Sequence, residues 1–137
     1  MVETWRGIYP ITSFVLEALT RKRDAADAVA LSPEEMTLLT VVEFWAAAAH
    51  GTLQQHLRPH ISEKLAAAQQ AFGVLGAVRV VSLLRVAGEE LHEHPLRPTA
   101  VIDQLDERLA RTDDNVDVLI ARYAGGIDHS TESATAQ

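Results

Sequence analysis

Apolar residues recur every three or four positions through almost the whole chain, and this spacing strongly limits the possible folds. The pattern is most regular near the C-terminus, at Ile102, Leu105, Leu109, Thr112, Val116, Leu119 and Tyr123. Spacings of three and four place side chains on one stripe of an α-helix. They predict an all-α protein whose last helix spans residues 99–123 and runs through the polar residues 112–115. Because residues 112–115 also resemble a helix start, two helices are the alternative.

Two helices are predicted before residue 60. The first spans residues 11–29. The second begins at Ser32, because Pro33 suits the first helical position and Glu35 can complete a capping box with the serine. Gly51 or Pro59 limits this helix. Its predicted core positions are Leu39, Val42, Ala46, Ala49 and Leu53, with Trp45 beside them.

Residues 60–93 are predicted to form one long helix, although residues 78–86 are rich in β-branched side chains that favour strands. The polar residues of this part, which recur every three or four positions, are Arg79, Ser82, Arg85 and Glu89. A half-buried strand would alternate every two residues instead. The remaining surface of the helix is apolar, which indicates a largely buried central helix. Gly73 and Gly76 each cost about 1 kcal/mol relative to alanine inside a helix, so we expect close packing or a kink there.

The predicted architecture is a bundle of four amphipathic helices, or five, in a single domain. A chain of 137 residues is long enough to bury one core and too short for two. Gly125 and Gly126 are predicted to end the last helix. Residues 1–126 then form the domain, and residues 127–137 a mobile tail.

Charge and composition exclude several classes of protein. The net charge is -7, and residues 98–137 hold eight acidic residues against three arginines. Because nucleic-acid binding needs clustered lysine and arginine, we expect no nucleic-acid partner, while the acidic helix would suit a basic protein partner. The longest apolar stretch, Leu65 to Leu84, is interrupted by Gln69, Gln70, Arg79 and Ser82, so we expect no membrane span. The absence of cysteine excludes disulfides and thiolate chemistry. Glu3 and the lack of a basic cluster near it do not match a signal peptide, and we expect a cytoplasmic protein.

Histidine and glutamate residues form a candidate metal site. Glu89 and His92 have the Glu-x-x-His spacing that puts two ligands on one helix face. Glu43 and His50 of the preceding helix, with His56 or His60, would complete a mononuclear site if the two helices are neighbours. The alternative is a solvated helix end, where histidines interact favourably with the helix dipole. The sequence indicates no cofactor besides this metal.

Arg79 and Arg85 are candidate ligand-binding residues. A charged side chain on a mostly buried helix reaches water, pairs with a carboxylate or lines a cavity. Pairing with a carboxylate is the simpler interpretation, and a ligand site is the alternative. The motifs of hydrolases, phosphate-binding loops and zinc proteases are absent from the sequence, which favours a non-catalytic protein over an enzyme.

The sequence supports two functional hypotheses. The first is a non-catalytic helical interaction module that acts as a homodimer or with a protein partner, because its apolar helix surface exceeds what a four-helix bundle needs. The predicted interface residues are Gly73, Gly76, Leu105, Leu109, Val116 and Leu119. The second is a bundle that binds a small molecule or metal, or acts as an enzyme, with its site between the second and third helices.

Overall fold

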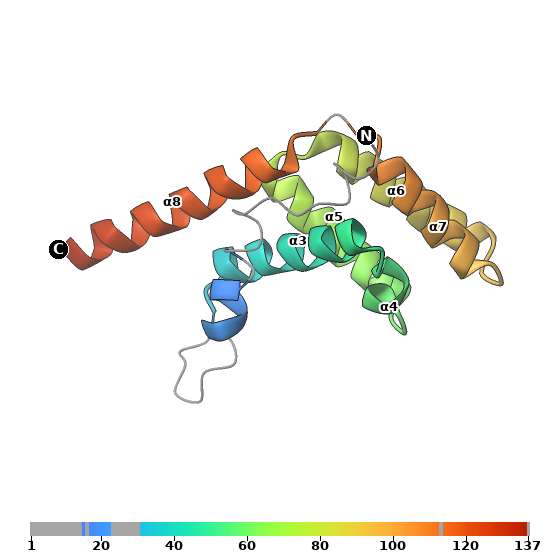
Figure 1. Cartoon of the computed structure of the whole chain (residues 1–137), viewed down its shortest axis with the longest axis horizontal. Coiled ribbons are helices and arrows are strands. Elements are labelled where there is room, and N and C mark those ends of the chain that lie inside the picture. Colours follow the sequence, from blue (N-terminus) through green and yellow to red (C-terminus); the bar gives the residue numbers. More distant parts are fainter. Residues whose placement is uncertain (1–14, 16, 23–30, 113, 137) are drawn as a thin grey trace.

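Helices make up the regular structure of the chain. The computed structural model describes residues 15, 17–22, 31–112 and 114–136, with side chains described as far as residue 127. These residues contain the six helices α3 to α8 and a helical stretch at residues 17–22, with no strand among them (Figure 1). The predicted all-α class is therefore confirmed. Most of the helix predicted over residues 11–29 lies outside the described residues, but Val15 and Leu19 are buried.

Helix α3 (Pro33–His50) begins where the sequence predicts. The Ser32 hydroxyl accepts a hydrogen bond from the Glu35 amide at 3.1 Å, and the Glu35 carboxylate accepts one from the Ser32 amide at 3.0 Å. Ten of the 18 residues of α3 are buried. The helix ends at Gly51, whose φ of 74° lies in the left-handed region that favours glycine.

Helix α5 (Ile61–Leu75) is central in the packing but is not largely buried. It contacts α3, α8, the neighbouring α6 (Val78–Glu93) and the short α4 (Leu53–Leu57). One face carries Phe72, whose ring lies edge-on to those of Phe44 and Trp45 at centroid distances of 5.6 and 6.3 Å. The opposite face is exposed. The prediction of a largely buried third helix is thus wrong. Helix α3 is the largely buried helix instead.

The predicted helix over residues 60–93 is divided in two at Gly76. This residue has a φ of 85°, and its amide donates to the carbonyl of Gly73. A left-handed glycine of this kind closes a helix and turns the chain. The kink expected near Gly73 and Gly76 is therefore a complete break, after which α6 packs back against α5.

The predicted helix over residues 99–123 is also two helices. α7 (Pro98–Leu109) ends before the polar residues 112–115, and α8 (Val116–Ala136) begins after them. The Asn115 side chain accepts from the amide of Val118 at 3.3 Å, as an N-cap residue does. The apolar side chains keep their period across the break, because Leu109 and Val116 both face the core.

Helix α8 does not end at Gly125 and Gly126, as the sequence predicts, but continues to Ala136. Tyr123 and Ile127 flank the glycine pair, and both pack against the core. This contact stabilises the helix where the glycines weaken it. The division into a domain and a mobile tail stays a prediction.

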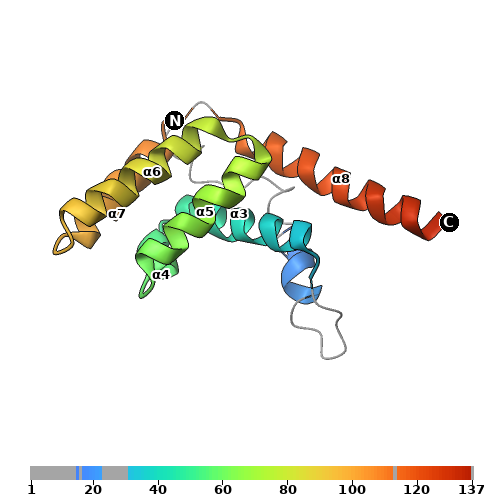
Figure 2. The same ribbon diagram turned by 180° about the vertical axis from the view of Figure 1, so that it is seen from behind.

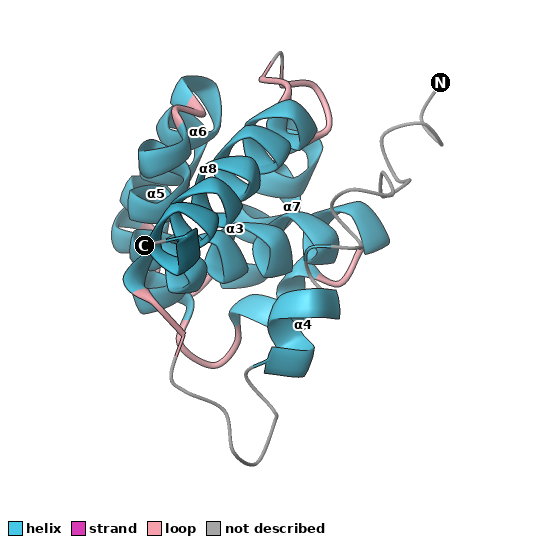
Figure 3. Cartoon of the chain, turned by 90° about the vertical axis from the view of Figure 1, so that its left-hand side faces the viewer, coloured by secondary structure: helices cyan, strands magenta, loops and turns pink. Residues whose placement is uncertain are grey.

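The helices are arranged around the contact between α3 and α5. α6 and α7 pack together at one end of the molecule, and α8 extends away from the other (Figures 1 and 2). Figure 3 views the molecule from the end of α8, with the other helices grouped behind it. None of the helices in the described part of the chain combines the length and apolar character needed to cross a bilayer.

Candidate functional site

The four predicted metal ligands do not come together. Glu43 and His50 line a shallow pocket of about 410 Å³ with His56, between α3 and the start of α4. His92 lines a different cleft, and Glu89 forms an ion pair with Arg85 at 3.3 Å. The packing explains this separation, since α3 lies against α5 and α8 while α6 lies against α5 and α7. In the described residues, no three His, Asp or Glu side chains are placed to hold a metal ion.

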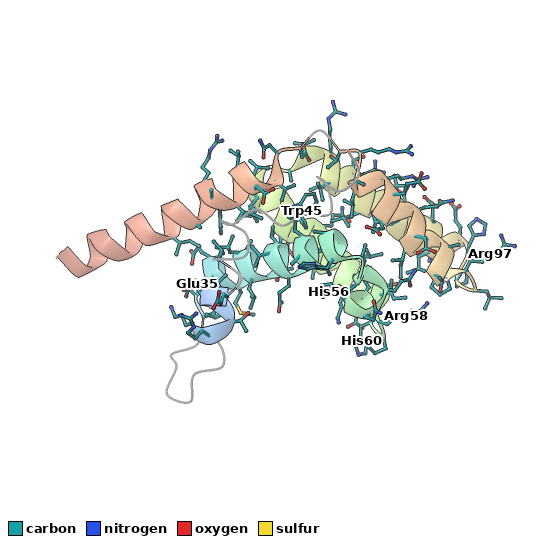
Figure 4. All side chains as sticks on the ribbon, in the orientation of Figure 1. Glu35, Trp45, His56, Arg58, His60 and Arg97 are labelled. Atoms are coloured by element: carbon teal, nitrogen blue, oxygen red, sulfur yellow. The ribbon has the colours of Figure 1, made fainter. Side chains whose placement is uncertain are left out.

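Of the two histidines in this pocket, His56 is the more buried. It belongs to α4 (Figure 4), and its ring lies edge-on to that of Phe44 on α3 at a centroid distance of 6.1 Å. Burial lowers the pKa of His56, the nearby positive charge of Lys64 lowers it further, and the Glu43 carboxylate partly opposes both. The environment therefore favours the neutral imidazole.

The two candidate arginines of α6 have different surroundings. Arg85 is exposed and pairs with Glu89 one helical turn later. Arg79 instead lines a pocket of about 310 Å³ with Arg108 and Arg111. Neither Arg108 nor Arg111 is a predicted site residue, although their spacing of three would place them close together on the single helix predicted over residues 99–123. Packing of α6 against α7 brings Arg79 to them.

Most of the predicted interface residues are occupied within the chain itself. Leu105, Leu109 and Val116 are 1%, 0% and 1% exposed, and Leu119 is half-buried against the same core. At these three fully buried positions, α7 and α8 therefore offer no exposed apolar surface to a partner. Gly73 and Gly76, in contrast, are exposed.

One face of α5 is exposed and carries no charge beyond Glu63 in the first turn of the helix. Residues 65–78 contain no Asp, Glu, Lys or Arg, although 23% of the chain is charged. The buried side of this run is Leu65, Ala68, Ala71, Phe72 and Leu75. We call its exposed side the uncharged α5 face, which consists of Ala66, Ala67, Gln70, Gly73 and Val74. Val74 is 55% exposed, and Val78 at the following corner is 73% exposed.

A cleft of about 920 Å³ lies next to this face, between α5 and α6. Ala66 belongs to both the cleft and the uncharged α5 face. The polar lining includes His60, Glu63 and His92, while Pro59, Pro95 and Pro98 form part of its rim. Because they share Ala66, the uncharged α5 face and the cleft together form one candidate binding surface.

No family model matches the chain, and neither a curated protein nor a solved structure is similar to it.

Proposed function

We propose that this chain is a non-catalytic helical interaction module that forms a homodimer through the uncharged α5 face. The observation that carries the proposal is residues 65–78, which lack charged side chains and yet supply an exposed helix surface. Exposed helix faces normally carry charged and polar residues. Depletion of charge is the compositional mark of the centre of a protein interface.

The absence of charge on this face allows a second copy of the chain to bind there. Each chain has a net charge of -7, so two copies repel one another over most of their surfaces. In a two-fold dimer the same patch meets itself, and like charges in the patch would oppose each other directly. The uncharged α5 face avoids this repulsion.

Side-chain size also supports the proposal. Ala66, Ala67 and Gly73 are small, which lets the backbone of a second helix approach closely. Val74 adds exposed apolar area at the end of the same face. The face extends over the nine residues from Ala66 to Val74, which corresponds to a length of about 13 Å. The sequence-predicted interface residue Gly73 belongs to it, whereas Leu105, Leu109 and Val116 already serve the core of their own chain.

A lysine in the middle of this face tests the proposal. Ala67→Lys places a positive charge on the uncharged α5 face, with Glu63 four residues earlier to support the helix. In a two-fold dimer the two new lysines oppose each other, so we expect the variant to dimerise with at least tenfold lower affinity than wild type. Sedimentation velocity and native mass spectrometry measure the change, from a dimer of about 30 kDa to the 15.0 kDa chain.

Ala121→Lys is the matched control. Ala121 is an exposed alanine on α8, and it also follows an acidic residue, Asp117, by four positions. The two variants change the charge and helix context equally, so Ala121→Lys stays dimeric under the proposal. Circular dichroism confirms that both variants remain helical. A monomeric wild-type chain at 100 µM would contradict the homodimer, as would equal dissociation of both variants.

A further inference from the structure

The pocket between the start of α6 and the end of α7 has the chemistry of an anion site. We infer that it binds a small phosphate monoester. Its lining residues are Arg79, Ser82, Leu83, Arg108, Arg111 and Thr112. Three guanidinium groups and two hydroxyls thus surround a volume of about 310 Å³, and none of the described residues that line it is acidic. This volume lies at the small end of the range for ligand pockets, which suits a compact ligand.

The position of the arginines is unusual for this part of the chain. Residues 98–137 contain eight acidic residues and only three basic ones, Arg108, Arg111 and Arg122. Two of these three line the pocket, where α6 adds Arg79. Guanidinium groups have five donors in a planar fork that matches the oxygens of a phosphate. Ser82 and Thr112 add hydroxyl donors of the kind that complete phosphate sites.

The ion pairs of Arg108 and Arg111 do not use all the donors of these two guanidinium groups. Arg108 contacts Glu90 at 2.8 Å, and Arg111 contacts Glu107 at 3.0 Å, each through one terminal nitrogen. Both pairs are at least partly exposed, so solvent screens them and they are weak. The remaining N–H groups are available for additional acceptors. The carboxylates therefore orient the guanidinium groups beside the pocket.

The helix dipole of α7 offers an alternative, purely structural explanation for the position of these arginines, and the experiment must distinguish it from ligand binding. Arg108 lies in the last turn of α7 and Arg111 lies just after the helix, at the end where cations interact favourably with the helix dipole. The first turn of α6 is already capped, because the Val80 amide donates to Asp114 at 2.9 Å. A structural role predicts effects on stability alone. Ligand binding predicts a saturable response to phosphate at Arg79, Ser82 and Thr112.

Nuclear magnetic resonance of the full chain distinguishes the two explanations. Titration with inorganic phosphate and then with glycerol 3-phosphate, at constant ionic strength set with chloride, should shift the amide signals of Arg79, Ser82 and Thr112 to saturation at millimolar concentrations. The ester should bind at least as tightly as phosphate, since the pocket has room beyond the phosphate group. Shifts that do not saturate and that chloride reproduces would overturn the inference. Weaker binding of the ester than of inorganic phosphate would overturn it as well.

Two matched variants complete the test. Arg111→Gln removes a pocket arginine, and Arg85→Gln removes an arginine outside the pocket on α6. Both arginines are exposed and both form ion pairs with a glutamate four residues away. We expect Arg111→Gln to weaken phosphate binding at least tenfold and Arg85→Gln to leave it unchanged. Equal weakening in both variants would show a general charge effect and overturn the inference. Neither substitution touches the uncharged α5 face, so the result is independent of the homodimer.

Discussion

The Asp114 carboxylate accepts a hydrogen bond from the backbone amide of Val80, 34 positions earlier in the chain. Ala77 precedes α6 and supplies no side-chain cap of its own. Asp114 therefore caps α6 from the connection between α7 and α8. This single contact joins the two places at which the chain breaks a longer predicted helix.

Removal of this long-range cap should destabilise the fold. Asp114→Ala leaves the partly buried Val80 amide without its acceptor, so we expect the free energy of unfolding to fall by about 1 kcal/mol. Asp114→Asn keeps an acceptor oxygen and should recover part of this loss. Urea denaturation followed by circular dichroism measures both. An Asp114→Ala variant as stable as wild type would show that the contact adds no net stability.

The sequence predicted the helical class and the start of α3 but not these two breaks. Apolar spacing reports which side chains face the core, and that register is the same for one helix or for two helices joined by a turn. Leu109 and Val116 are both buried on either side of the turn. The polar residues 112–115 resemble a helix start, but the apolar spacing continues through them and favours one helix. Their role depends on a partner in α6, which no local pattern contains.

The two glycines at the end of α5 should respond oppositely to alanine. Gly73 lies inside the helix, where a new Cβ would meet Val81 at an ordinary 3.8 Å. Gly73→Ala should therefore raise the free energy of unfolding by up to about 1 kcal/mol. Gly76 has a positive φ, so Gly76→Ala should lower it by about 1 to 2 kcal/mol through backbone strain.

Each glycine variant acts as the control for the other in denaturant unfolding. The measurement is made at one fixed protein concentration, because dimer formation would make stability depend on concentration. A continuous helix over residues 60–93 predicts that both alanines stabilise the chain. Opposite signs support the break at Gly76, and stabilisation by both substitutions would contradict it.

The candidate sites were less predictable than the helices, for a similar reason. Helix spacing correctly places Glu89 and His92 one turn apart, but it cannot tell which neighbour that helix packs against. The structure pairs α6 with α7, which separates these residues from Glu43 and His50 and brings Arg79 to Arg108 instead. Sites built from two helices need the tertiary arrangement as well as the spacing.

Burial of His56 should make stability sensitive to mild acid. Its pKa in the folded chain lies below the value of about 6.5 expected when unfolded, chiefly because burial disfavours the charged ring. The unfolded chain therefore binds the proton first as the pH falls through about 6.5, and the free energy of unfolding decreases. Above that pH the ring is neutral in both states, and this contribution is constant.

The substitution His56→Gln should reduce the loss of stability between pH 7.5 and 5.5. The exposed neighbour Gln55, which does not titrate, provides the control, and Gln55→Ala should keep the wild-type pH dependence. Urea unfolding at several pH values gives the slope for each chain, so a constant change in stability from the lost ring does not affect the comparison. Identical slopes for wild type and His56→Gln would contradict the prediction.

The edge-on pair of Phe44 and Phe72 should couple α3 to α5 energetically. Both side chains are buried, at 1% and 0% exposure, and the ring centroids lie 5.6 Å apart. Replacement of either by leucine keeps an apolar side chain but loses the ring contact, at a cost of about 1 kcal/mol each. The double variant should cost less than the sum by about 0.5 to 1.5 kcal/mol, since the second replacement has no ring contact left to remove.

A second cycle shows whether this coupling is specific. Ile102 is buried on α7, which packs against α4 and α6. The costs of Phe44→Leu and Ile102→Val should therefore add within about 0.5 kcal/mol. Additive costs in both cycles would mean that the aromatic contact contributes no more than the apolar area that it buries. Coupling confined to Phe44 and Phe72 would instead identify this ring pair as a specific link between the two central helices.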